Sequence, residues 1–398
     1  MSRTDIAEEL RLTRAGVTII INDLIGSGII RETESRSTPS GRPPVVLEID
    51  PERGLVAAID IGASHLSIAV GDITCHIFEE TERPFNIADG PEVCLQTVAT
   101  LLEVIVNKCG LKIKDLSAIG ISVPGPVITD AGMVMAPPIM PGWDRFPIRE
   151  SLEKLWAVPV TLNNDADLGA LGEWAYGAGR GEKNIAFIKV GSGIGAGIII
   201  NHQILVGASG SAGEIGHLTI DTNGPLCTCG NNGCLEAFAS GRAIEIQARK
   251  LVESGKRTLL SEHNPKTISV KDVADAARRG DLVSQDILNS SGIFIGIAIA
   301  GLINLINPGV VIIGGGVAES GDLLTAPIRK MVKERSLRAS EHAVRITTAM
   351  LGRRSTLIGA MVQANSVAIH NMVEMRTPAS KAVFTKELEV FPKIPIRR

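Results

Sequence analysis

The cysteines of this chain are unevenly spaced, and their spacing carries the clearest chemical signal in the sequence. Three of the six cysteines are crowded into one glycine-rich stretch that follows His217, at Cys227, Cys229 and Cys234. One imidazole and three thiolates make up the ligand set of a closed tetrahedral zinc site, and such clustering fits a cytosolic metal site better than disulfides. Because four protein ligands leave no open position, the predicted zinc is structural. It would fix the loop that carries Glu214, His217 and Glu236. The alternative is three reduced cysteines that meet by chance.

Two stretches far apart in the chain share one design, an apolar strand, a turn of small residues and a second apolar strand. They are residues 55–70 and 185–200. One glycine-rich hairpin is usually only turn chemistry, but backbone N–H groups at such turns can also hold an anion. The repeat of the design, followed by a third apolar strand that ends in Gly314-Gly315-Gly316, predicts an internal duplication. We therefore expect two sheets with helices that face each other across a cleft.

The first 50 residues predict a small DNA-reading unit. Residues 2–10 form a short amphipathic helix, residues 11–13 a tight turn, and Thr13 the N-cap of a second helix with one apolar stripe. Two short strands around a polar tip, residues 29–32 and 45–49, predict a wing. In a winged helix-turn-helix the second helix enters the major groove, and a wing Arg contacts phosphate or the minor groove. The residues expected to contact DNA are Thr13, Arg14, Thr18 and Arg42.

The charges of this unit are balanced, because its arginines are matched by nearby aspartates and glutamates. DNA binding must therefore rest on local contacts and not on net charge. Winged helices of this kind normally have a preceding helix that completes the core, so we expect that the first helix of the unit is missing, through a misassigned start or a truncated chain. The alternative interpretation is a small helical cap used for dimerisation.

The stretch from Gly216 to Glu236 resembles the signature of the ROK (repressor, open reading frame, kinase) family, in which a His precedes a Cys-x-Cys-Gly-x-x-Gly-Cys-x-Glu run. The resemblance covers about residues 2–365 and includes the segments 123–127, 141–143, 163–167 and 171–173. It implies an α/β fold of the duplicated, actin-like (ribonuclease H-like) sugar-kinase type, preceded by an N-terminal winged helix-turn-helix.

The resemblance also implies roles for individual residues. Asp165 holds the position of the general base that takes a proton from the attacking sugar hydroxyl. The implied sugar ligands are Asn164, Asp165, Glu214, His217 and Glu236, and carboxylates and amides in a cleft are suited to hydroxyl groups. The implied nucleotide contacts are Asp60, Gly62, Ser64, Gly191, Ser192, Gly193, Gly314 and Gly315. The alternative role for Asp165 is the N-cap of the helix that follows it.

The first phosphate turn departs from the pattern of the family's kinases. They carry Asp-x-Gly-Gly-Thr followed by Lys or Asn, whereas this chain has Asp60-Ile61-Gly62-Ala63-Ser64-His65. The methyl group of Ala63 obstructs a close phosphate approach, and Ile139 stands where kinase-like members often place Asn. The second turn keeps the family pattern. These departures favour a repressor, so ATP and Mg²⁺ are expected as ligands only if kinase activity is retained.

The composition is that of a globular protein with two or three domains. The 398 residues are 44% hydrophobic and 21% charged, with a net charge of −3, which excludes a strongly basic nucleic-acid binder and a disordered chain. No signal-peptide pattern opens the sequence, and the longest apolar stretch, residues 292–303, is shorter than the roughly 20 residues that span a bilayer. We expect a buried core helix there, a cytoplasmic protein and no membrane partner.

Together these patterns predict a sugar-responsive, DNA-binding repressor of carbohydrate metabolism. Its expected partners are operator DNA and a small sugar or sugar phosphate, and its expected state is a homodimer or homotetramer. The expected domains are residues 1–50, residues 51–164 with about 351–375, residues 165–350, and a C-terminal extension, residues 376–398. The alternatives are an ATP-dependent sugar kinase of the glucokinase type and a sugar-binding regulator that acts through a protein partner.

Overall fold

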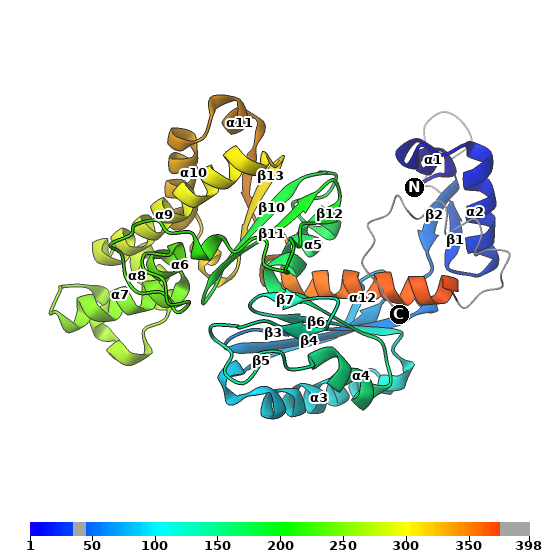
Figure 1. Ribbon diagram of the computed structural model, residues 1–398, viewed down its shortest axis with the longest axis horizontal. Helices are drawn as coiled ribbons and strands as arrows, with labels where there is room; N and C mark the ends of the chain where they lie inside the picture. The colour runs from blue at the N-terminus through cyan, green and yellow to red at the C-terminus, as the bar shows by residue number, and fades with distance from the viewer. Residues whose placement is uncertain (35–44, 375–398) are drawn as a thin grey trace.

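The structure is a computed structural model that describes residues 1–34 and 45–374 (Figure 1). Its N-terminal unit consists of α1 (Arg3–Leu10), α2 (Arg14–Gly26), β1 (Ile30–Glu34) and β2 (Val45–Ile49), with the two strands antiparallel. Thr13 caps α2 as predicted, because its Oγ1 accepts a hydrogen bond from the N–H of Gly16 at 3.1 Å. A small core of Ala7, Val17, Ile21 and Leu47 joins the helices to the sheet. The predicted helix, turn, helix and strand pair are confirmed.

The first large sheet has the strand order β5-β4-β3-β6-β9. Its strands are β3 (Leu55–Ile61), β4 (His65–Asp72), β5 (Ile77–Pro84), β6 (Ala118–Val123) and β9 (Val160–Asn164). The short hairpin of β7 (Val127–Ile128) and β8 (Met133–Val134) follows β6. Alternate residues of β3 point to opposite faces, so Ile59 packs in the core with α3 (Pro91–Lys108) and α4 (Ile148–Trp156), whereas Ala58 packs with α12 (Ser355–Glu374). The sheet is therefore covered on both faces.

The second large sheet has the strand order β12-β11-β10-β13-β14. Its strands are β10 (Ile185–Val190), β11 (Ile194–Ile200), β12 (Gln203–Ile204), β13 (Val310–Gly314) and β14 (Arg345–Thr348). The helices that follow or connect them are α6 (Leu235–Ala239), α7 (Gly241–Glu253), α8 (Val270–Arg278), α9 (Leu282–Ile306), α10 (Asp322–Arg335) and α11 (Arg338–Ala343). Helices α6 to α10 share one core with a face of this sheet, and α5 (Asp165–Tyr176) packs on the opposite face.

The two sheets have the same connectivity, which confirms the predicted duplication. In each, the first strand pairs antiparallel with the second and parallel with the fourth, which in turn pairs parallel with the fifth. The helices that follow the fifth strands, α5 and α12, cross between the sheets. Glycine makes this crossing possible, because a Cβ at Gly172 would lie 2.1 Å from the carbonyl oxygen of Ser355 and one at Gly359 1.8 Å from that of Leu168.

Among the described helices, α9 alone is long and apolar enough to cross a membrane by length and composition, with a mean hydropathy of 1.7 over its best window. Of that window, 61% is buried inside the protein. Ile295, Ile299 and Ile303 lie in the core of the second sheet, and α9 packs against α8 and α10. The predicted core helix at residues 292–303 is confirmed.

Helix α12 extends from the second sheet, along the first sheet, towards the N-terminal unit (Figure 1). Near the end of α12, Met372 packs closely against Gly54. A Cβ added to Gly54 would lie 2.7 Å from the Cε of Met372. Gly54 lies between the N-terminal unit and β3. One helix therefore contacts the chain at the point where the N-terminal unit joins the body.

Candidate functional site

A cleft with a volume of about 1910 Å³ lies between the two sheets. The first predicted phosphate turn reaches it with Asp60, Gly62 and Ser64, and the second with Gly191, Ser192 and Gly193. The implied sugar ligands Asn164, Asp165, Glu214, His217 and Glu236 also line it. Of the two glycines at the end of β13, Gly315 lines the cleft and Gly314 does not. Residues from six distant segments of the chain thus meet at one cavity.

The first predicted phosphate turn, residues 60–65, is filled by the side chain of His65. Asp60 is buried at the end of β3, where its Oδ1 accepts a hydrogen bond from Ser122 at 2.7 Å and its Oδ2 lies 3.2 Å from Nε2 of His65. Burial raises the pKa of Asp60, but the charge of Lys189 and the contacts with His65 and Ser122 outweigh it and bring the pKa to about 2. The His65 ring lies over Gly62, since a Cβ there would be 2.1 Å from His65 Cε1. The imidazole closes the turn.

The start of α5 corrects one expectation. Asn164, and not Asp165, is the N-cap, because its Oδ1 accepts hydrogen bonds from the N–H groups of Ala166 at 2.8 Å and Asp167 at 3.3 Å. The Asn164 side chain also donates to the carbonyl of Gly125 at 2.9 Å, so most of its hydrogen-bonding capacity is used within the protein. Asp165 is the first helical residue, so its carboxylate does not cap the helix and lies at the cleft.

Lys189 is a residue of this site that the sequence patterns did not identify. Its Nζ donates to Oδ2 of Asp165 at 2.8 Å, and both side chains are mostly buried. Burial lowers the pKa of Lys189, but Asp165 and Asp60 outweigh that effect and hold it above its ordinary value. The available signal was one lysine in the otherwise apolar strand 185–190.

ATP and Mg²⁺ are expected only if kinase activity is retained, and the side chains of Asp60 and Asp165 do not fit a magnesium ion. Both oxygens of Asp60 are engaged by Ser122 and His65, and Asp165 is paired with an ammonium group. A hard divalent cation needs free carboxylate or water oxygens around it. The side chains at this end of the cleft therefore do not fit a bound magnesium–nucleotide.

Acidic groups crowd together at the cleft, where Asp165, Glu214 and Glu236 line it and Asp167 is buried beside them. Burial raises the pKa of Asp167 to about 8, and the neighbouring Asp165 and Glu214 add to the rise. Burial also raises the pKa of Glu214, where His217 opposes the rise and Asp165 and Glu236 support it. Glu236 ties the second turn to the cysteine loop, since its Oε2 accepts from the N–H of Ile194 at 3.0 Å and its Oε1 from Thr228 at 3.4 Å. The carboxyl groups of Asp165, Glu214 and Glu236 therefore line the cleft together.

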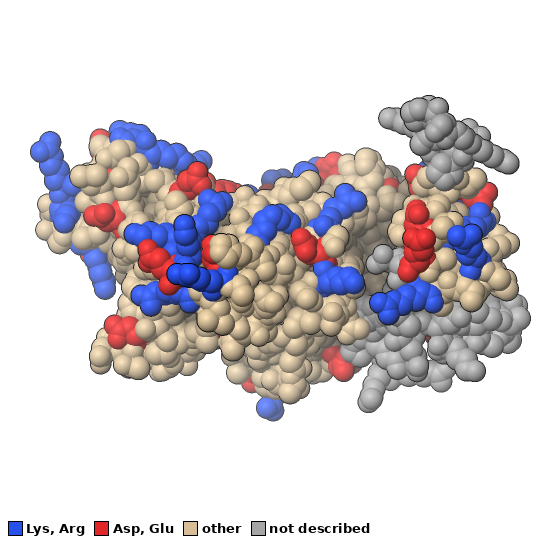
Figure 2. Space-filling model, turned by 90° about the horizontal axis from the view of Figure 1, so that it is seen from above, with Lys and Arg blue, Asp and Glu red and all other residues tan. Residues whose placement is uncertain are grey.

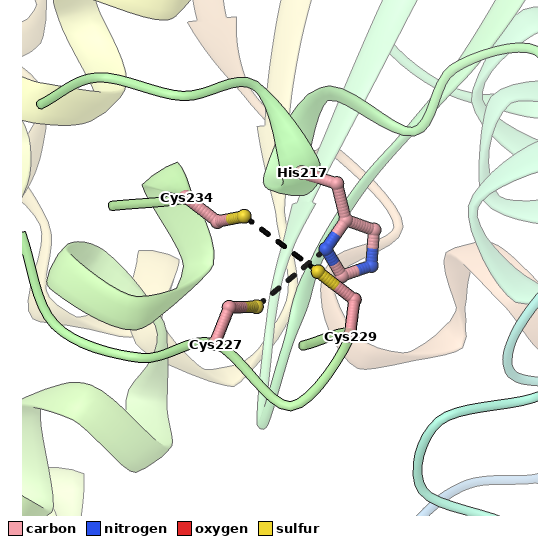
Figure 3. Close-up of side chains that lie close together, drawn as sticks. All are labelled: His217, Cys227, Cys229 and Cys234. Carbon is pink, nitrogen blue, oxygen red and sulfur yellow. Dashed lines mark hydrogen bonds between the residues drawn. The ribbon is translucent and has the colours of Figure 1, made fainter. Parts of the chain in front are cut away.

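The four predicted zinc ligands meet at one point (Figure 3). Nδ1 of His217 lies 3.7 Å from Sγ of Cys227, Sγ of Cys229 lies 3.7 Å from Sγ of Cys234, and all four ligand atoms are within 4.8 Å of one another. Zinc–sulfur bonds of about 2.3 Å in a tetrahedron place sulfur atoms roughly 3.8 Å apart. The cluster therefore fits a four-coordinate zinc ion.

His217 connects this cluster to the cleft. Its Nδ1 faces the thiols, and its Nε2 lies 3.9 Å from Oε2 of Glu214 on the cleft side. Burial and contacts with Cys229 and Cys227 raise the pKa of the Cys234 thiol to about 12, so a thiolate at this position needs a cation beside it. A metal at the cluster would hold the ring, and with it the orientation of Nε2.

The predicted DNA contacts lie on the N-terminal unit, away from the cleft (Figure 1). Thr13, Arg14 and Thr18 are exposed, but the Thr13 hydroxyl caps α2 and the Thr18 hydroxyl donates to the carbonyl of Arg14 at 2.7 Å. Arg14 has no ion-pair partner among the described residues, so its guanidinium keeps its donors for a ligand. Arg42 lies outside the described residues. Basic and acidic side chains are interspersed over the face shown in Figure 2.

Glu173, which ends the segment 171–173 included in the resemblance, does not line the cleft. Its side chain is 0% exposed and accepts four hydrogen bonds. The donors are the N–H groups of Ala178, Met350 and Leu351 and the hydroxyl of Ser355. Glu173 therefore joins α5 to the segment that leads from β14 into α12.

Comparison with known proteins agrees with this architecture. A model of the ROK family matches residues 56–367. The chain is 32% identical over 376 residues, 94% of its own length and 94% of the relative's, to a putative xylose repressor of Caldicellulosiruptor sp. (strain Rt8B.4). It is 34% identical over 304 residues, 76% of this chain and 92% of the other, to a glucokinase of Halalkalibacterium halodurans. A crystal structure of a ROK family transcriptional regulator, a homologue of the E. coli MLC protein, matches with a TM-score of 0.79 at 29% identity and covers 94% of this chain and 95% of that one. The chain therefore belongs to the ROK family and has its sugar-kinase-like α/β fold.

Proposed function

We propose that this protein is a sugar-responsive transcriptional repressor of carbohydrate metabolism, with a winged helix-turn-helix that binds operator DNA and a cleft that binds the sugar. One observation carries the proposal. A cleft with converging hydroxyl-binding groups and an exposed helix–turn–helix unit lie on the same chain, and α12 runs from one towards the other. The similarity to a putative xylose repressor supports it, because that match covers 94% of this chain and 94% of the relative.

The sugar would bind on the floor of the cleft. Asp165, Glu214 and Glu236 offer acceptors, Nε2 of His217 offers a donor, and Asn164 positions the start of α5 beside them. A structural zinc at His217, Cys227, Cys229 and Cys234 would keep the loop from Glu214 to Glu236 rigid. Such converging charged and polar groups give hydroxyl groups short, charge-assisted hydrogen bonds.

The sugar signal requires two arrangements of the body. We take residues 51–164 with about 351–375 as one lobe and residues 165–350 as the other, with the cleft between them. A sugar that binds one arrangement more tightly shifts the equilibrium by that difference in affinity. Because α12 passes from the joint at Glu173 to Gly54, a change in the joint would reorient the N-terminal unit.

The DNA contact would come from α2. Arg14 would reach base edges in the major groove, Thr13 and Thr18 would lie beside it, and Arg42 of the wing would contact phosphate or the minor groove. Two copies related by two-fold symmetry would read two operator half-sites, so we expect a dimer or a pair of dimers.

The test is a gel-shift titration of the full chain on the DNA upstream of its own gene, with and without each sugar of a panel. We expect specific binding that one sugar changes at least several-fold. Arg14→Ala should lose operator binding. The matched control is Arg257→Ala, in the lobe of residues 165–350, which should keep it. Sugar binding without any DNA binding would favour a regulator that acts through a protein partner.

A sugar kinase of the glucokinase type is the second candidate, and the position of Asp165 at the start of α5 is the observation that favours it. Phosphoryl transfer depends on positioning and charge stabilisation around the transferred group, and the first turn lacks room and free carboxylates for it. Coupled ADP release over the same sugar panel tests this candidate. Turnover of about 1 to 100 per second that Asp165→Asn abolishes would establish it.

A further inference from the structure

Among the described residues, Lys189 is the lysine whose charge acts on both Asp60 and Asp165 in the cleft. It lies at the end of β10, opposite Gly195 on β11 and Gly314 on β13, so no side chain on either neighbouring strand separates it from the cleft. Its Nζ is 2.8 Å from Asp165, and its charge is also the main influence that favours the ionised form of Asp60. The lysine is therefore shared between an aspartate of the first sheet and one at the start of α5.

The surrounding glycines and strand direction show why the side chain has this orientation. Ile185, Phe187 and Lys189 alternate along β10 and belong to the face on which α5 packs. Ile185 and Phe187 are buried under α5, whereas Lys189 lies beyond the first residue of that helix. The side chain of Lys189 is 17% exposed, and moving it further into solvent would leave Asp165 without its hydrogen-bonded counter-ion.

We propose that Lys189 is a built-in counter-ion that takes the position of a divalent cation between Asp60 and Asp165, so that the cleft accepts a neutral sugar without nucleotide or metal. The ammonium repels a second cation and neutralises the carboxylates that would attract one. It leaves Asp165 able to accept a sugar hydroxyl while Lys189 donates to the same hydroxyl or its neighbour. The sugar part of this inference rests on the proposed function, whereas the exclusion of a metal does not.

The metal part is tested on the zinc-loaded full chain without sugar or nucleotide, with Mn²⁺ as the probe and the signal of free Mn²⁺ in electron paramagnetic resonance as the readout. Lys189→Met keeps the length of the side chain and removes its charge. We expect it to bind Mn²⁺ at least tenfold more tightly than the unmodified protein, and the further change Asp165→Asn to abolish that gain. Lys189→Arg and the exposed-site control Lys183→Met should behave like the unmodified protein.

Equal Mn²⁺ affinity of the unmodified protein and Lys189→Met would overturn the proposal, as would a gain in Lys183→Met of the same size. If Lys189→Met does not fold, the unmodified protein still decides the matter by calorimetry with a sugar that binds. Sugar affinity that is unchanged by millimolar Mg²⁺ and ATP supports the proposal, and affinity that requires either one overturns it. If no sugar binds at all, the proposed function fails while the Mn²⁺ comparison still tests Lys189.

Discussion

Replacing Glu173 by Gln should loosen the joint between α5 and α12, at a side chain that does not itself line the cleft. The Glu173 carboxylate is 0% exposed. Its Oε1 accepts from the N–H of Leu351 at 2.8 Å and the hydroxyl of Ser355 at 2.7 Å, and its Oε2 accepts from the N–H groups of Ala178 at 2.8 Å and Met350 at 3.1 Å. All four neighbours are donors, so an amide NH₂ at either position faces a donor.

The free-energy cost of Glu173→Gln is set by the amide orientation that leaves the fewest buried donors unsatisfied. If the NH₂ takes the Oε1 position, the Ser355 hydroxyl can turn and accept, but the N–H of Leu351 is left without an acceptor in a buried site. An unsatisfied buried donor costs about 1–3 kcal/mol, and the two hydrogen bonds that remain lose the extra strength of a charged acceptor. We expect a total of about 3 kcal/mol, which corresponds to roughly a 100-fold increase in local opening.

Hydrogen exchange measured by mass spectrometry reports this opening directly. Peptides that contain residues 350–355 should exchange about 100-fold faster in Glu173→Gln, whereas those of α3 should not change. The matched control is Glu182→Gln, because Glu182 is 37% exposed and 3.7 Å from Arg345, and exposed pairs contribute only about 0–1 kcal/mol. If exchange at residues 350–355 rises less than about threefold in a folded variant, the hydrogen bonds of Glu173 do not hold this segment as we infer.

Three further predictions concern the metal, the pH dependence and the DNA contact. Elemental analysis should find about one zinc per chain. The zinc should be lost in Cys234→Ser and kept in Cys94→Ser, because the Cys94 thiol is buried in another core. Zinc retained by Cys234→Ser would contradict the proposed zinc site. The pKa of Asp60 falls from 3.8 to about 2 on folding. Its ionised form should therefore add about 2 kcal/mol to the free energy of unfolding above pH 4, and this contribution should be lost as the pH falls towards 2. Acid unfolding of Asp60→Asn should show less of that loss, and an unchanged acid profile would contradict it. Arg14→Ala should lose about 1–3 kcal/mol of discrimination between operator and random DNA, whereas equal loss on both would make Arg14 a phosphate contact.

Much of the local structure could be predicted because short-range patterns report it directly. Thr13 before an apolar stripe predicted the start of α2, and the hairpin repeat predicted both large sheets. The cysteine cluster was predicted as well, because glycines keep Cys227, Cys229 and Cys234 near one another whatever the rest of the chain does. The role of Asn164 as N-cap was missed, since Asn and Asp cap helices equally well and only the backbone angles distinguish them.

What the sequence by itself determined is therefore the order of the elements, the duplication, the metal-ligand cluster and the family resemblance. The tertiary structure decided which charges meet. Lys189 reaches Asp165, His65 and Ser122 engage Asp60, and Glu173 reaches the segment before α12, through contacts whose partners are up to 178 positions apart. Side-chain periodicity reports which face of an element is buried, but it carries no information on which distant element covers that face. The packing of two duplicated sheets around one cleft makes that choice, and with it the chemistry that the cleft can support.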